Sequence, residues 1–95
     1  MNESYVKQKR NKTDQDVLNT LINNKLDYPR YEIKVKDNNN IISTFLTNSQ
    51  ESAHLIATIL LKIPTRKSAT ITFFKNAYNS EIREIIKYEK PTKTS

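Results

Sequence analysis

The chain has neither glycine nor cysteine among its 95 residues. Without cysteine, disulfide bonds and thiolate metal sites are excluded. Without glycine, the phosphate-cradling loops of nucleotide-binding folds are excluded, and turns that need positive φ must be made by asparagine or aspartate. Asparagine, lysine and isoleucine are abundant and have A/T-rich codons, whereas glycine codons are G/C-rich. We therefore infer an AT-rich source genome, such as that of a low-GC bacterium, its phages or plasmids, or a parasite.

Histidine is almost as scarce, with His54 as the single example. With no cysteine and no second histidine, zinc sites and Ser-His-Asp arrangements lose their usual parts. The carboxylates are scattered. Glu81 and Glu84 would lie close together in a helix, where a solvated charged face is a simpler interpretation than an acid/base pair. Spacing alone leaves a metal-dependent nuclease open, but we expect no enzyme, no catalytic residue, no metal and no cofactor.

Long apolar runs are also missing. The first residues, MNESYVKQKRNKTDQD, lack the apolar core of a signal peptide. The longest apolar stretch, from Asn48 to Pro64, has fewer than the roughly 18 apolar residues that suggest a membrane span. We expect a cytoplasmic protein that interacts with no membrane and no small-molecule substrate.

That stretch predicts the central helix of the fold, over about residues 49–63. Asn48 is the expected N-cap, and Glu51 completes a capping box. Pro64 ends the helix because proline disfavours helical geometry in the preceding residue. The polar positions fall on one line: His54, Thr58 and Lys62. We therefore expect the helix to expose only a narrow edge.

A first helix is predicted from Thr13 to Leu26. Thr13 is a good N-cap, and Asp14 and Asp16 suit the positive end of the helix dipole. Apolar residues follow at helical spacing: Val17, Leu18, Leu21, Ile22 and Leu26. The central helix has more apolar surface than one sheet covers, so we expect this stripe, or another chain, to cover its flank.

Strands are predicted on either side of the central helix. Apolar and polar residues alternate from Tyr31 to Lys36, and the turn Asp37–Asn40 leads to a second strand, Ile41–Thr47. The second strand has large apolar residues in both alternating sets, which fits a central strand covered on both faces or an interface. A third strand is predicted at Ala69–Lys75.

The segment Glu81–Glu89 fits two structures. Three isoleucines fit a short helix, whereas alternation would set Ile82, Glu84, Ile86 and Tyr88 against Arg83, Ile85 and Lys87. We favour the strand, because a short loop after a strand commonly returns antiparallel. The predicted fold is α+β, in the order α-β-β-α-β-β, with the central helix on one face of an antiparallel sheet. It comprises a flexible basic arm (1–12), one domain (13–90) and a frayed tail (91–95).

The net charge is +6 and half of it lies in the arm, which has four basic residues and one acidic residue. A basic arm can gain affinity for phosphates through counterion release. Further basic residues lie in the first strand and in the loop after the central helix. The candidate nucleic-acid-binding residues are Lys7, Lys9, Arg10, Lys12, Lys34, Lys36, Arg66 and Lys67. The alternative is a solvated terminus in a chain whose codon bias inflates its lysine content.

Aromatic residues offer a second mode of nucleic-acid contact. Exposed aromatics on a sheet beside Lys34 and Lys36 would be able to stack bases. Phe45 and Phe73 are better core residues, which leaves Phe74 and one or two tyrosines as candidates.

Two classes of function fit these observations. The first is a small non-enzymatic nucleic-acid-binding accessory protein of a phage, plasmid or other mobile element, which contacts DNA or RNA phosphates through the arm and loop. The second is a protein-binding module or inhibitor that acts on a host enzyme or forms a homodimer through its sheet. Small size and the two-phase apolar pattern favour the second, whereas the basic charge favours the first. A ribosome- or membrane-associated structural subunit fits the charge but no other feature.

Overall fold

The computed structural model describes residues 13–87, so the basic arm and the tail lie outside the described residues. The elements in chain order are α2 (Asp14–Leu21), β1 (Arg30–Asp37), β2 (Ile42–Thr47), α3 (Gln50–Leu60), β3 (Arg66–Asn76) and β4 (Asn79–Lys87). The predicted α+β class is confirmed, and the last segment is a strand.

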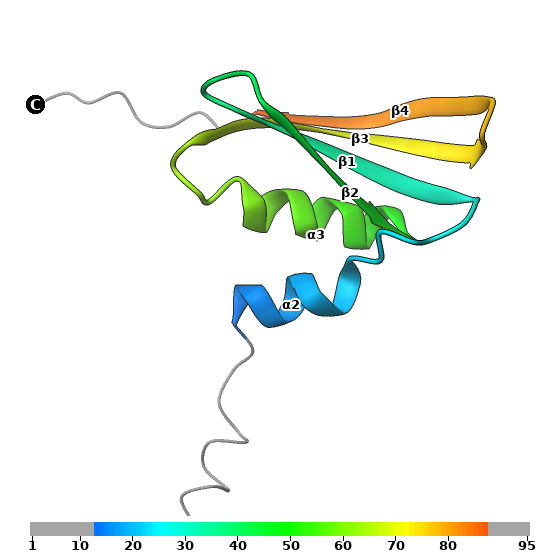
Figure 1. Cartoon of the computed structure of the whole chain (residues 1–95), viewed down its shortest axis with the longest axis horizontal. Helices are drawn as coiled ribbons and strands as arrows, with labels where there is room; N and C mark the ends of the chain where they lie inside the picture. Colours follow the sequence, from blue (N-terminus) through cyan, green and yellow to red (C-terminus); the bar gives the residue numbers. More distant parts are fainter. Residues whose placement is uncertain (1–12, 88–95) are drawn as a thin grey trace, which may run out of the picture.

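The elements form three layers (Figure 1). One layer is a fully antiparallel sheet with strand order β2-β1-β3-β4. The helix α3 lies beneath the sheet, and α2 packs against α3 on the side away from the sheet. The flank of the central helix is therefore covered by the first helix of the same chain. Neither helix in the described part of the chain is long and apolar enough to span a membrane.

The core lies between the sheet and α3. In the middle of the sheet, Ile33 of β1 pairs with Phe45 of β2 and Ile71 of β3, and Val35 pairs with Ala69. Alternate residues of a strand point to opposite faces, so these side chains all point towards α3. The most buried members of this core have at most 1% of their surface exposed: Ile33, Val35, Ala53, Ile56, Ala57, Ala69 and Ile71.

The central helix differs from its prediction at both ends. Its N-cap is Ser49, whose hydroxyl accepts a hydrogen bond from the backbone N–H of Ser52 at 3.1 Å. The predicted capping box of Asn48 and Glu51 is therefore wrong by one residue. The helix ends at Leu60, so the prediction of about 49–63 was too long. Its exposed edge is also wider than expected, because Leu55 is 44% exposed.

The first helix begins after the predicted N-cap, Thr13, which forms a capping box with Asp16 that the prediction did not include. The helix ends at Leu21 rather than Leu26. The two asparagines after Ile22 form hydrogen bonds with β2 instead of continuing the helix. The backbone N–H of Asn23 donates to the Leu46 carbonyl at 2.9 Å, and the Leu46 N–H donates to the Asn24 side chain at 3.1 Å. Asparagine has low helix propensity because its side chain competes for backbone hydrogen bonds. Since β2 is an edge strand, its interpretation as a central strand is wrong.

The turn between β1 and β2 is made without glycine, as predicted. Asn40 takes the positive φ of 66°. The Asp37 carboxylate accepts hydrogen bonds from the backbone N–H groups of Asn39 and Ile41, at 2.8 and 2.9 Å. These bonds fix the turn and return the chain into β2.

A β-bulge at Arg83 changes which residues of β4 share a face. Thr72 of β3 pairs with Ile82 and the adjacent Ile71 pairs with Glu84, so Arg83 is the extra residue. Ile82 therefore lies on the same face as Ile85 and Lys87. The predicted alternation, which separated Ile82 from Ile85, is wrong because a single inserted residue reverses the phase of a strand.

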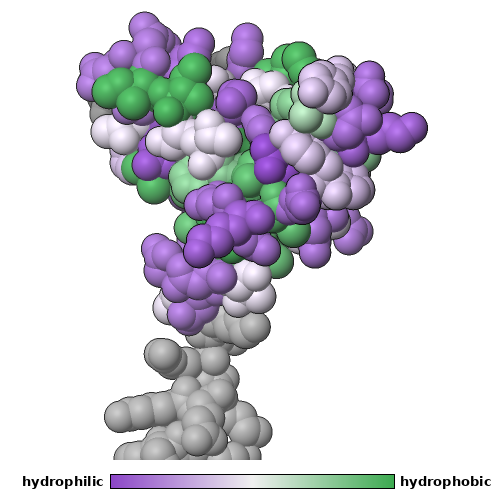
Figure 2. All heavy atoms as spheres, turned by 45° about the vertical axis from the view of Figure 1, so that its right-hand side comes forward, coloured by the Kyte–Doolittle hydropathy of each residue, from purple (hydrophilic) through white to green (hydrophobic). Residues whose placement is uncertain are grey.

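Several large apolar side chains are exposed. Ile41 and Ile42, 61% and 52% exposed, lie near the β1–β2 turn, and Ile82 and Ile85, 60% and 57% exposed, lie on β4. Figure 2 shows apolar groups at the surface as separate patches among hydrophilic side chains. The apolar residues of the second predicted strand are thus divided between the core and the surface.

Candidate nucleic-acid interface

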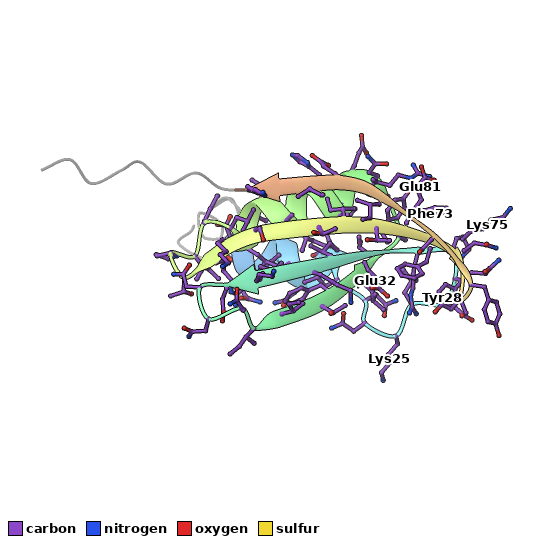
Figure 3. The ribbon with its side chains drawn as sticks, turned by 90° about the horizontal axis from the view of Figure 1, so that it is seen from above. Lys25, Tyr28, Glu32, Phe73, Lys75 and Glu81 are labelled. Carbon is purple, nitrogen blue, oxygen red and sulfur yellow. The ribbon has the colours of Figure 1, made fainter. Side chains whose placement is uncertain are left out.

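Both helices lie on one face of the sheet, and the opposite face is viewed in Figure 3. We call this opposite face the open face. Strand register assigns it fifteen side chains: Arg30, Glu32, Lys34 and Lys36 of β1; Ile42, Thr44 and Leu46 of β2; Ser68, Thr70, Thr72 and Phe74 of β3; and Ser80, Ile82, Ile85 and Lys87 of β4. Apart from Leu46, all of these residues are at least partly exposed.

Positive charge is concentrated on this face. The open face has four basic residues and one acidic residue, a net charge of +3. The rest of residues 13–87 has six basic and seven acidic residues, a net charge of −1 with His54 neutral. The composition of the described domain is close to neutral, so the basic face results from how the fold sorts the side chains.

The basic side chains gather towards one end of the sheet. Lys36 and Lys87 flank Ser68 in one cross-strand row, and Lys34 lies between Thr44 and Thr70 in the next. Lysine ammonium groups and serine or threonine hydroxyls are typical partners of phosphate oxygens. Within each row lysines alternate with hydroxyl groups, and the exposed Ile42 and Ile85 each occupy one end of a row.

The contacts of these lysines differ. The Lys34 ammonium lies 3.4 Å from a Glu32 oxygen and 3.4 Å from the Thr44 hydroxyl. Among the described residues, Lys36 and Lys87 form no ion pair and no side-chain hydrogen bond. An anion that binds at this end of the open face would therefore break few existing ion pairs or hydrogen bonds.

At the other end of the open face, the Tyr28 ring packs against Arg30 and Phe74. The Arg30 guanidinium lies 4.2 Å from the centre of the Tyr28 ring and donates to the Leu26 carbonyl at 2.8 Å. Tyr28 in turn contacts Phe74, with ring centres 6.3 Å apart. Figure 3 shows Tyr28 and Glu32 towards this end of the sheet. The alternation of residues along β3 places Phe74 on the open face as expected, but Tyr28 partly covers it.

The other two phenylalanines belong to the covered face. Phe45 packs against the hydrophobic core. Phe73 contacts Tyr31, with ring centres 4.9 Å apart, and the Arg83 guanidinium lies 4.8 Å from its ring centre. Phe74 is therefore the only aromatic residue of the described strands on the open face, and it lies at the end away from Lys36 and Lys87.

The structure brings together only some of the predicted site residues. Lys34 and Lys36 are neighbours on the open face. Arg66 pairs in register with Asp37 on the helix side and lines a hollow next to α2. Lys67 is exposed next to the Lys36 row, at an irregularity of the β1–β3 ladder. Lys7, Lys9, Arg10 and Lys12 lie outside the described residues.

Lys87 is the residue that the sequence prediction did not single out. Its position follows from the β4 bulge and from the place of β4 beside β3, neither of which has a signal in the pattern of apolar residues. Only its basic character at the end of a predicted strand suggested a surface role.

Metal-binding side chains do not cluster within residues 13–87. No group of three histidine or carboxylate residues is placed to hold a metal ion there. His54 is exposed on α3 and lies 3.0 Å from the Glu84 carboxylate of β4. This pair lies at the surface and joins α3 to β4.

Comparisons with protein-family models, with curated proteins and with solved structures returned no match to this chain.

Proposed function

We propose that this protein is a non-enzymatic nucleic-acid-binding protein that contacts the phosphate backbone through its open face. Lys34, Lys36 and Lys87 supply the positive charge, and the hydroxyls of Ser68 and Thr70 donate to phosphate oxygens. The observation that carries the proposal is the separation of charge, with +3 on the open face and −1 on the rest of the described domain.

Binding to the backbone fits the face better than reading of bases. Single-strand binders that use a sheet stack bases on exposed aromatic side chains, and Phe74 is instead partly covered by Tyr28. Lysines and hydroxyls bind any phosphate regardless of sequence. We therefore expect weak sequence preference and strong dependence on salt. The arm residues Lys7, Lys9, Arg10 and Lys12 would add further phosphate contacts.

The test compares two triple variants that remove the same charge from different surfaces. K34A/K36A/K87A removes the lysines of the open face, and the control K25A/K62A/K75A removes three exposed lysines from the loop before β1, from the turn after α3 and from the end of β3. Binding to labelled duplex DNA, single-stranded DNA and RNA is measured by fluorescence anisotropy over a series of salt concentrations.

Each phosphate contact contributes about 0.9 to the slope of log affinity against log salt for B-DNA. We expect the open-face variant to lower that slope by about 2–3 and the control to lower it by less than about 1. Equal losses in the two variants would show generic electrostatics and refute an open-face site. A third variant, K7A/K9A/R10A/K12A, measures the separate contribution of the arm.

The second candidate function is binding to a protein partner, and it is favoured by the exposed isoleucines of β4 and of the β1–β2 turn. If the wild-type chain does not bind any of the three nucleic acids at low salt, the nucleic-acid proposal fails and a protein partner becomes the better interpretation.

A further inference from the structure

The two edge strands of the sheet, β2 and β4, differ in the hydrogen bonding of their outward backbone groups. At β2, the edge is occupied at Leu46 by hydrogen bonds from Asn23 and to Asn24. At the other edge, β4 is nine residues long and its one strand neighbour in the described chain is β3. An edge of this length presents a row of outward backbone groups that can pair with another strand.

The helical layer reaches β4 through side chains of α3. The helix α3 packs mainly on β1 and β3, and it meets β4 through side-chain contacts such as His54 with Glu84 and Gln50 with Arg83. These contacts lie on the helix side of β4, whose outward backbone edge has no further strand beside it in the described chain.

The bulge at Arg83 interrupts the regular alternation of this edge. At Arg83 the strand has one residue more than a regular partner would have. Arg83 and Glu84 both point to the helix side, because Arg83 lies over the Phe73 ring and Glu84 reaches His54. The regular strand β3 pairs across this bulge with one residue fewer, and bulges are a common protection of sheet edges. A second copy of β4 carries the same bulge and can match it.

One antiparallel register aligns the two bulges. If Arg83 lies opposite Glu84 of the second copy, two-fold symmetry sets Glu84 opposite the second copy's Arg83. Ile82 then lies opposite Ile85 of the second copy, and both are on the open face. Ser80 opposes the second copy's Lys87, so no like charges face each other. This register keeps every residue from 80 to 87 on the same face as its opposite.

We propose that this chain forms a two-fold homodimer through β4, which joins the two sheets into one of eight strands. The chemistry of the edge supports a second copy as its partner. Residues 82–85 read apolar, basic, acidic, apolar, so they are complementary to themselves when run antiparallel. The charged side chains are accessible, with 33% of Arg83 and 32% of Glu84 exposed. The isoleucine pairs would cover side chains that are now 60% and 57% exposed.

The dimer does not depend on nucleic-acid binding, but it has a consequence for it. Two-fold symmetry perpendicular to the sheet places both open faces on the same side and both helical layers on the other. The two lysine clusters would then belong to one continuous surface.

The first test is a charge swap. R83E would set glutamates opposite glutamates and E84R would set arginines opposite arginines, whereas R83E/E84R restores opposite charges in reversed order. Sedimentation equilibrium over a concentration series should give a dimer for the wild-type chain. We expect each single variant to raise the dimer dissociation constant by at least about tenfold, and the double variant to recover most of that loss.

The second test uses the absence of cysteine from the chain. I82C and I85C are made as separate full-length chains and mixed under mild oxidation. Residues directly opposite in an antiparallel pair have Cα atoms about 4.5–5.5 Å apart, within the range of a disulfide. Ile82 of the two copies would be offset by three residues, about 10 Å. We expect the mixture to form crosslinked dimer and I82C alone to form little.

Circular dichroism and thermal unfolding of each variant separate loss of dimer from loss of fold. A wild-type chain that is monomeric at every concentration measured would overturn the proposal. Equal crosslinking of I82C alone and of the mixture would overturn this register. Nucleic-acid binding by a strict monomer would leave the open-face proposal intact and refute only the dimer.

Discussion

The two faces of the sheet are built by the same strands and have opposite properties. In β3, Ala69 and Ile71 are completely buried against α3. Ser68, Thr70 and Thr72, which alternate with them, face the other side and are partly exposed. In β1, Ile33 and Val35 alternate with lysines. The period of two thus assigns one phase of each strand to stability and leaves the other phase for contacts with a partner. Substitutions in neighbouring positions should therefore affect different measurements.

The largest expected effect comes from the covered face. I71A removes most of a fully buried side chain next to α3 and should lower the free energy of unfolding by about 2–5 kcal/mol. T70A, one residue away on the open face, should lower it by about 1 kcal/mol or less. Urea unfolding of both variants measures the difference. Similar losses would mean that the two faces do not differ in burial as described.

The second prediction removes the outer helical layer. Leu21 of α2 packs against the core, so a carboxylate there should weaken the docking of α2 on α3. We expect L21D to cost about 2–3 kcal/mol of unfolding free energy. N19D lies on the exposed side of the same helix and should change it by less than about 0.5 kcal/mol. An unchanged stability for L21D would contradict the three-layer arrangement.

The third prediction compares two threonines of β2. Thr47 is 1% exposed on the covered face, and its hydroxyl donates to the Leu21 carbonyl at 2.7 Å. T47V keeps the shape but removes this donor, which should cost about 1–2 kcal/mol. Thr44 is exposed on the open face, and T44V should stay within about 0.5 kcal/mol of the wild type. Thermal unfolding of T47V and T44V measures this difference in stability.

The smallest effect on stability is expected for a substitution of Lys36, which should nevertheless weaken nucleic-acid binding. Lys36 makes no ion pair with another described residue, so K36T should change the unfolding free energy by less than about 0.5 kcal/mol. The same change should lower the salt-dependence slope of nucleic-acid binding by about 1. If K36T destabilised the protein and left binding unchanged, the open face would be a structural surface only.

The sequence predicted the order of elements well because each has a local cause. The N-cap at Thr13, the alternation in β1 and the asparagine-rich turn before Ile41 all depend on neighbouring residues. The ends of the helices were less predictable. The first helix stops at Leu21 because Asn23 and Asn24 bond to Leu46, more than twenty residues away. The low helix propensity of asparagine is a local signal, but it does not reveal this distant partner.

The candidate site was predicted only in part for the same reason. Lys34 and Lys36 share a face because they are two residues apart, which alternation alone shows. Their nearness to Lys87 depends on the strand order and on the bulge at Arg83, which are properties of the assembled sheet. The opposite orientation of Arg66 also depends on where the register of β1 and β3 shifts, next to Asp37.

The turn at Asn40 has a consequence for the unfolded chain. Glycine is the residue with the most backbone freedom before folding, and that freedom is lost when the chain becomes ordered. This protein makes its positive-φ turn with asparagine, so the native turn adopts a less favoured conformation while the denatured ensemble stays narrower. With no glycine anywhere in the sequence, this reduction in the entropy lost on folding applies along the whole chain.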